Sequence, residues 1–238
     1  MVQRFSGEEK IGAIVAEYPG ASNLFKEVRI DFCCGGDRSL AEAVHLKKLD
    51  EQDILKRLND GYQEMKKRAE QEETDWREVP IAELVDYIVH RHHGYLRQEL
   101  PLLSEFVTKI LRVHGEGHAE LAELHRLFHQ MKIELDQHLI EEEERLFPLL
   151  KQWEEEPSAE QRERMVKALD GLEDDHSAVG ELLKDMRAAT NGYALPAEAC
   201  RTYTIAFRKL DELESDLFQH IHLENNILFP RVLKLSAS

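Results

Sequence analysis

The fold is decided by two segments that share one pattern, HLIEEEERLFP at residues 138–148 and HIHLENNILFP at residues 220–230. Laid over each other without a gap, they match at the histidine, at the glutamate four residues later and at the closing Leu-Phe-Pro. Residues i and i+4 project from the same side of a helix, so each histidine and glutamate can hold one ion between them. The two segments are 82 residues apart, and two other histidines, His93 and His176, are 83 residues apart. This spacing indicates a pair of helices used twice.

Four long segments with helical periodicity contain these motifs, and breaks that carry glycine or proline separate them. Their approximate bounds are residues 80–113, 118–153, 159–189 and 197–234. An apolar stripe in steps of three and four residues runs along each segment, and one histidine interrupts each stripe. In the second segment the stripe continues after the motif through Leu146 and Leu149. Because no part of this half alternates with a period of two, the sequence predicts an all-α fold with an up-down four-helix bundle.

Six polar side chains stand in these apolar stripes, so we expect them in the bundle core. They are His93, His138, Glu142, His176, His220 and Glu224. A carboxylate buried without partners is costly, so these groups must satisfy one another or bind a metal. Imidazole together with carboxylate in a helical bundle favours non-haem iron over structural zinc, which takes closed tetrahedral sites.

The residues alone leave two alternatives open. In the first segment, His92 lies on a second apolar stripe, whereas the repeat spacing and the longer stripe favour His93. The competing interpretation of the whole pattern is that the histidines are ordinary core residues. The glutamate run is expected to be a solvated face apart from its ligand, with Glu141, Glu143 and Glu144 in water.

The chain before the bundle contains shorter elements. Residues 1–65 are predicted to form a small helical domain, residues 66–79 a polar linker, and residues 80–238 the bundle. Within the first domain, Ser39 and Asp50 each precede an acidic residue by three positions, which is typical of helix N-caps.

Two adjacent cysteines, Cys33 and Cys34, stand in the stretch DFCCGG at residues 31–36. Adjacent cysteines are poorly placed for a relaxed disulfide, so the pair does not indicate a disulfide framework. They are either two small buried residues beside a glycine turn or thiols that the turn exposes. Exposed thiols could relay iron, bind nitrosyl species or take part in redox exchange.

Composition excludes several classes of partner. The 238 residues contain 31 Lys and Arg against 47 Asp and Glu, a formal net charge of −16. This charge repels nucleic-acid phosphates and anionic membrane surfaces, so we expect neither as a partner. No apolar run approaches the roughly 20 residues that span a bilayer. With no secretory signal and three cysteines, the expected location is the reducing cytoplasm.

Taken together, these motifs resemble the hemerythrin-like di-iron proteins and, within them, the repair-of-iron-centres family. The resemblance rests on DFCCGG at 31–36, Arg91-His92-His93 with Leu100-Pro101 downstream, the His138/Glu142 pair, Glu173-Asp174-Asp175-His176 and residues 220–230. It implies two non-haem iron ions bound by the six residues of the stripes and bridged by Glu142 and Glu224. An oxo or hydroxo bridge between the two ions is also implied.

The resemblance also implies a function. The family repairs iron–sulfur clusters damaged by nitrosative or oxidative stress, and donation of iron to damaged iron–sulfur proteins is the favoured mechanism. An alternative is an enzyme that reduces nitric oxide to nitrous oxide at the same centre, and whether the chain is an enzyme stays open. Oxygen or redox sensing is less favoured. A homodimer is compatible with a small domain that presents a cysteine loop.

Overall fold

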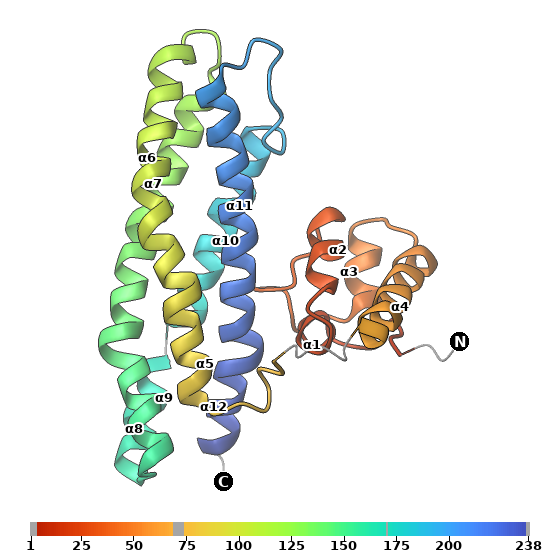
Figure 1. The fold of residues 1–238 in the computed structure, drawn as a ribbon, viewed down its shortest axis with the longest axis vertical. Coiled ribbons are helices and arrows are strands. Elements are labelled where there is room, and N and C mark those ends of the chain that lie inside the picture. The colour runs from red at the N-terminus through yellow and green to blue at the C-terminus, as the bar shows by residue number, and fades with distance from the viewer. Residues whose placement is uncertain (1–3, 69–73, 170, 237–238) are drawn as a thin grey trace. The chain divides into compact units, whose positions relative to one another are not determined.

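The computed structural model describes residues 4–68, 74–169 and 171–236, which form helices joined by turns with no β-strand among them (Figure 1). The chain folds as two compact units, Met1–Leu84 with Phe218–Ser238, and Val85–Leu217. Within the described residues, no helix is both long enough and apolar enough to cross a membrane. The all-α class predicted from the sequence is confirmed.

The first unit joins the short helices of the N-terminal region to the end of the chain. Its helices in the described residues are α1 (Ile11–Glu17), α2 (Ala21–Glu27), α3 (Leu40–Leu46), α4 (Glu51–Arg68), the π-helical turn η3 (Glu224–Leu228) and α12 (Phe229–Ser236). Ser39 and Glu42 form a capping box that starts α3. The Oδ1 atom of Asp50 accepts hydrogen bonds from the backbone N–H groups of Gln52 and Asp53 at the start of α4. Both predicted N-caps are therefore confirmed.

Apolar side chains of α1 to α4 share one core in the first unit, in which Phe25, Phe32 and Leu58 are fully buried. The ring of Phe218, which begins the C-terminal part of the unit, packs edge to face on Phe32 with the centroids 5.7 Å apart. The core of the short helices thus extends onto the last helical stretch of the chain.

The predicted linker at 66–79 is only partly described. Its first residues, 66–68, continue α4, residues 69–73 lie outside the described residues, and a turn at residues 76–78 follows. Arg231 of α12 holds the described end of this segment, because its guanidinium donates to the carbonyl of Trp76 at 2.8 Å and to that of Val79. The segment before the bundle is therefore anchored through its backbone.

The second unit is built from long helices that lie side by side, with consecutive ones running in opposite directions (Figure 1). Its elements are α5 (Ile81–Ile88), which starts in the first unit, η1 (Val89–His93), α6 (Gly94–His114), α7 (Glu120–Glu141), η2 (Glu142–Leu146), α8 (Phe147–Glu155), α9 (Ala159–Leu169), α10 (Leu172–Ala189) and α11 (Arg201–Leu223), which ends in the first unit. The helix α7 packs against both α6 and α10.

Ion pairs fasten α11 to its neighbours in this unit. Lys209 donates to Glu99 of α6 at 2.5 Å. Arg187 of α10 reaches both carboxylate oxygens of Glu214, at 2.8 and 2.9 Å, and donates to Asp211 at 2.6 Å. The antiparallel bundle predicted from the stripes is present, with α6, α7, α10 and α11 as its long helices.

The third predicted segment is not one helix. The sequence pattern predicts continuous periodicity over 159–189, whereas α9 ends at Leu169 and α10 begins at Leu172. Gly171, between them, has φ of +92°, a left-handed conformation that glycine adopts without strain from a Cβ. One glycine therefore breaks the helix locally, and the spacing of apolar residues does not predict such a break.

In the part of the chain that the structure describes, three π-helical turns interrupt the long helices, and each replaces an i to i+4 bond with an i to i+5 bond. The N–H of Gly94 bonds to the carbonyl of Val89, that of Phe147 to Glu142, and that of Phe229 to Glu224. Pro148 and Pro230 stand one residue beyond the phenylalanines that close the last two turns, and they have no N–H with which to continue the regular ladder. The Leu-Phe-Pro ending of the repeat thus coincides with a π-turn in both copies.

The π-turn in the second long helix corrects one prediction. The stripe predicts Leu149 as the buried residue after Leu146, but Leu150 is fully buried and Leu149 only partly. A π-turn takes one more residue than an α-turn, so the inward face moves one position along the chain.

Candidate metal centre

Three buried histidines of the second unit surround the carboxylate of Glu142, which opens η2. His93 ends η1, His138 lies in the last turn of α7, and His176 lies near the start of α10. The Oε2 atom of Glu142 is 3.4 Å from Nε2 of His93 and 3.4 Å from Nε2 of His138. The Nε2 atoms of His138 and His176 are 2.9 Å apart. A donor atom from each of His138, Glu142 and His176 lies within 4.8 Å of the other two.

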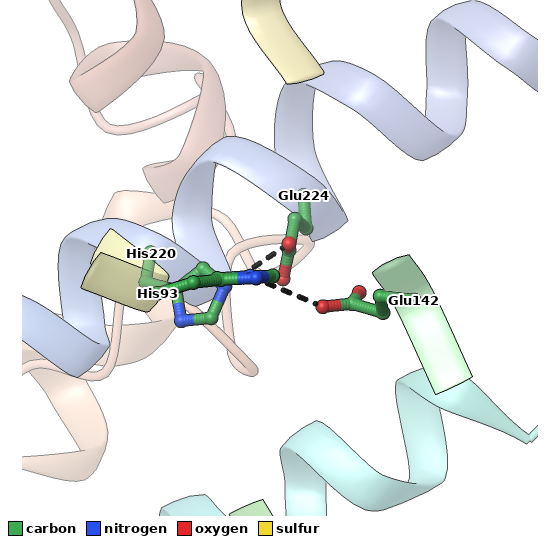
Figure 2. Close-up of side chains that lie close together, drawn as sticks. All are labelled: His93, Glu142, His220 and Glu224. Carbon is green, nitrogen blue, oxygen red and sulfur yellow. Dashed lines mark hydrogen bonds and ion pairs between the residues drawn. The ribbon is translucent and has the colours of Figure 1, made fainter. Parts of the chain in front are cut away.

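The first unit holds the other predicted pair. His220 lies in the last turn of α11 and Glu224 opens η3, and their side chains are 1% and 0% exposed. The Nε2 atom of His220 is 3.0 Å from Oε1 of Glu224. Figure 2 draws this pair and the pair of His93 and Glu142, with a dashed line marking the contact inside each pair.

The opposite edges of two imidazole rings face carboxylates. The Nδ1 atom of His93 is 2.6 Å from Oε1 of Glu143, and Nδ1 of His138 is 3.5 Å from Oδ2 of Asp175. Metal-binding histidines commonly donate the second ring N–H to a carboxylate, which leaves the other nitrogen as the ligand. Both rings therefore direct Nε2 toward Glu142 and Nδ1 away from it.

Glu143 is not the solvated residue that the sequence predicts. Its side chain is 24% exposed and also forms an ion pair with Arg97. Burial raises the pKa of the Glu143 carboxyl, but hydrogen bonds from Arg97 and His93 outweigh it and hold that pKa below its usual value. Because the contact with His93 joins two different helices, no spacing along one helix indicates it.

His92 and His93 face different carboxylates. His93 faces Glu142, whereas Nδ1 of His92 lies 3.1 Å from Oδ2 of Asp216 in α11. Asp216 also pairs with Arg91 at 3.2 Å. The buried contact between His92 and Asp216 could not be predicted from the sequence, since nothing in its spacing connects residue 216 to residue 92.

The donor atoms have both the chemistry and the spacing that an iron ion requires. Imidazole nitrogen and carboxylate oxygen are both ligands of iron in helical bundles. Two atoms that bind one ion at about 2.1 Å lie roughly 3.0–3.4 Å apart, which matches the distances from Glu142 to His93 and to His138. A cation would also offset the charge of Glu142, a fully buried carboxylate. The residues therefore fit an iron ion.

The cysteine pair lies in the first unit. The Cys33 thiol donates to Oδ1 of Asp31 at 3.3 Å, and its sulfur is 3.8 Å from that of Cys34. Of the two alternatives for the pair, burial holds for Cys33, which is 2% exposed, while Cys34 is partly buried. A hydrogen bond with Cys34 and burial raise the pKa of the Cys33 thiol well above its usual value, so Cys33 is protonated at neutral pH.

The turn itself explains this burial. Oδ1 of Asp31 accepts hydrogen bonds from the backbone N–H groups of Cys33, Cys34 and Gly35 at 3.2, 3.0 and 3.1 Å. These bonds wrap the chain around one carboxylate and draw the first thiol inward.

Comparison with known proteins adds two domain matches. Residues 84–232 match the sequence profile of the family described as Hemerythrin HHE cation binding domain. Residues 7–62 match ScdA_N, described as Domain of Unknown function (DUF542). The two matches cover the bundle and the region of the short helices.

Curated relatives match almost the whole chain. The iron–sulfur cluster repair protein YtfE of Escherichia coli O81 (strain ED1a) is 37% identical over 227 residues, which cover 95% of this chain and 97% of that protein. Proteins of the same name from Escherichia coli (strain SMS-3-5 / SECEC) and from Escherichia fergusonii are 36% identical with the same coverage.

Proposed function

This chain belongs to the hemerythrin HHE cation-binding family, and from that premise we propose that it repairs damaged iron–sulfur clusters by holding iron in its bundle and donating it. The observation that carries the proposal is Glu142, a fully buried carboxylate with imidazole nitrogens of His93 and His138 each 3.4 Å away. Relatives named for iron–sulfur cluster repair match it over 95% of its length.

The proposed site holds two non-haem iron ions. Its ligands are His93, His138, Glu142, His176, His220 and Glu224, with the two glutamates and an oxo or hydroxo group as bridges. Support comes from the pairing of one histidine with one glutamate in each copy of the repeat and from the burial of all six side chains. When bound, iron would be a redox-active cation that the protein can pass to a cluster that lacks iron.

The surrounding residues keep the ligands ready for the ion. Glu143 holds the proton on Nδ1 of His93, so that Nε2 keeps its lone pair toward Glu142. The apolar side chains of the bundle exclude water around these groups and keep the rings in place.

The proposed partners are damaged iron–sulfur proteins of the cytoplasm. We assign their recognition to the domain of residues 1–65, joined by the linker 66–79 to the bundle of residues 80–238. In this assignment Cys33 and Cys34 are the functional thiols. Support comes from the placement of both thiols in one turn with Asp31, in a region with its own core and its own family match.

Metal analysis and iron transfer test the function together. Protein purified without oxygen is expected to contain about two iron ions per chain, in line with bundle di-iron sites. It should restore activity to an iron–sulfur enzyme inactivated by nitric oxide, without other added iron. Glu142→Leu should lose both properties, and Glu144→Leu, at an exposed position of the same turn, should keep both.

Two results would redirect the proposal. Zinc as the sole metal in anaerobically purified protein would contradict it. Sustained formation of nitrous oxide from nitric oxide, with iron retained and no transfer to the client enzyme, would instead support nitric oxide reduction at the same residues.

A further inference from the structure

Asn226, in the middle of η3, joins the last helical stretch of the chain to the cysteine turn within the first unit. Its Nδ2 atom donates to the carbonyls of Phe32 and Cys33, at 3.3 and 3.2 Å. The same nitrogen is 3.1 Å from Nδ1 of His222, a buried ring that packs edge to face on Phe32. Two amide hydrogens thus serve three acceptors, of which two are backbone carbonyls of the turn.

Two glycines make room for this carboxamide. A Cβ added to Gly12 or to Gly36 would lie 2.3 Å from Oδ1 of Asn226, far inside normal contact distance. The N–H of Gly12 also donates to the carbonyl of Gly36 at 2.8 Å. The start of α1, the end of the cysteine turn and Asn226 therefore meet at one point where only hydrogen atoms fit on the two glycines.

Asn226 lies close in sequence to a proposed iron ligand. η3 begins with Glu224, a proposed iron ligand, and Asn226 follows two residues later in the same five-residue turn. Its bonded partner, Cys33, carries the more deeply buried of the two thiols in the turn. One side chain therefore connects the turn that carries the ligand to the turn that carries the thiols.

We propose that Asn226 is a positioning residue that fastens the Cys33–Cys34 turn to η3 and keeps the Cys33 thiol shielded until this contact opens. The purpose of such shielding rests on the proposed function, since a thiol that serves repair must meet its client in an opened state. The fastening itself is a property of the folded chain and can be tested without a client.

The test measures thiol alkylation by N-ethylmaleimide in the full-length protein as purified, with each cysteine followed separately by peptide mass spectrometry. Asn226→Ala is expected to speed alkylation of Cys33 by about tenfold or more, since two hydrogen bonds that close the turn are lost. Alkylation of Cys200, an exposed thiol in the other unit, is the internal reference and should stay the same. The matched control is Asn23→Ala, which removes an exposed amide of α2 in the same unit and should leave Cys33 slow.

Two further variants distinguish the effect of the Asn226 hydrogen-bond donor from the effect of side-chain packing. Asn226→Asp keeps the size of the side chain but replaces the two-hydrogen amide with a carboxylate, so it should also speed alkylation of Cys33. Gly12→Ala should do the same by steric clash. Combining Gly12→Ala with Asn226→Ala should add little beyond either change alone, because the clash and the bonds involve the same side chain.

Unfolding of the whole unit must be told apart from local opening. Local opening predicts that the Cys33 rate in Asn226→Ala stays nearly constant in low urea, whereas a rate that climbs steeply with urea would show global unfolding and overturn the proposal. An unchanged Cys33 rate in both Asn226→Ala and Asn226→Asp would overturn it as well. Alkylation needs no client and no transfer of iron, so a failure of the repair function would leave this result standing.

Discussion

His93 and Glu143 are joined by a 2.6 Å contact between Nδ1 of the ring and Oε1 of the carboxylate. The ring is fully buried, and its other nitrogen lies 3.4 Å from Glu142. Glu143 follows Glu142 directly in η2, so one π-turn presents two carboxylates to opposite edges of one imidazole. The orientation of the His93 ring is therefore set by two adjacent residues, Glu142 at Nε2 and Glu143 at Nδ1.

Removing the outer carboxylate should weaken the site without removing a ligand. Glu143→Ala is expected to lower iron affinity by about 10- to 100-fold, the range found when partners of metal-binding histidines are lost. Glu144→Ala is the control, because Glu144 is exposed in the same turn. Competition with a chromophoric chelator measures both affinities, and equal values for the two variants would show that Glu143 does not orient His93.

Removing the inner carboxylate should separate metal binding from folding. Glu142→Leu is expected to abolish iron retention but to leave far-UV circular dichroism unchanged, because the bundle buries much apolar surface elsewhere. The metal-free variant should unfold at the same temperature as the metal-free parent or higher, since a buried charge is gone. A marked loss of helical signal in metal-free Glu142→Leu would show that this carboxylate is needed for the fold itself.

The buried pair of Arg187 and Glu214 should matter for stability apart from any metal. Glu214 is 3% exposed, so Arg187→Ala leaves its carboxylate without its main cation. We expect the free energy of unfolding to fall by roughly 3–5 kcal/mol. Lys184→Ala, which breaks a surface pair with Glu181, should cost less than about 1 kcal/mol. Urea titrations of metal-free protein compare the two, and similar midpoints would contradict the prediction.

Cys200 should react at lower pH than an ordinary cysteine. The backbone N–H of Tyr203 and the side chain of His114, 3.2 Å from the sulfur, lower the pKa of the Cys200 thiol. The thiolate is the reactive form, so the alkylation rate should rise with pH around a midpoint below the usual thiol pKa. His114→Ala should shift that midpoint upward, and His118→Ala should shift it less. A midpoint that does not respond to His114→Ala would exclude the imidazole as a cause.

Much of this architecture could be predicted from spacing within single helices. A glutamate four residues after a histidine must share its side of the helix, and His138 and Glu142 do lie in contact. Glu143, Asp175 and Asp216 were out of reach of such reasoning, because their partners are on other helices. Spacing along one chain segment carries no information about which residue meets a ring from a neighbouring helix.

The apolar stripes did not predict the π-turns either, although the spacing of the residues that prove to be buried indicates them. His138, Leu146 and Leu150 are buried, with Glu142 between the first two, so the inward face advances in three successive steps of four. In a regular helix twelve residues turn about 120° beyond three full turns, which would carry Leu150 away from the core. One extra residue in a wide turn reduces that deviation to about 20°. Apolar or ligand positions in successive steps of four that continue through Leu-Phe-Pro are thus a usable signal.

The wide turn in η2 also determines how the deletion of one residue would affect the helix that follows it. Deleting one residue from η2 would let the N–H of Phe147 bond four positions back, so the helix would survive with its hydrogen bonds intact. Everything after the deletion would rotate by about 100°, and Leu150 would leave the core. A variant shortened by a single residue at this point would therefore keep its helical content but present α8 with its apolar side turned to water.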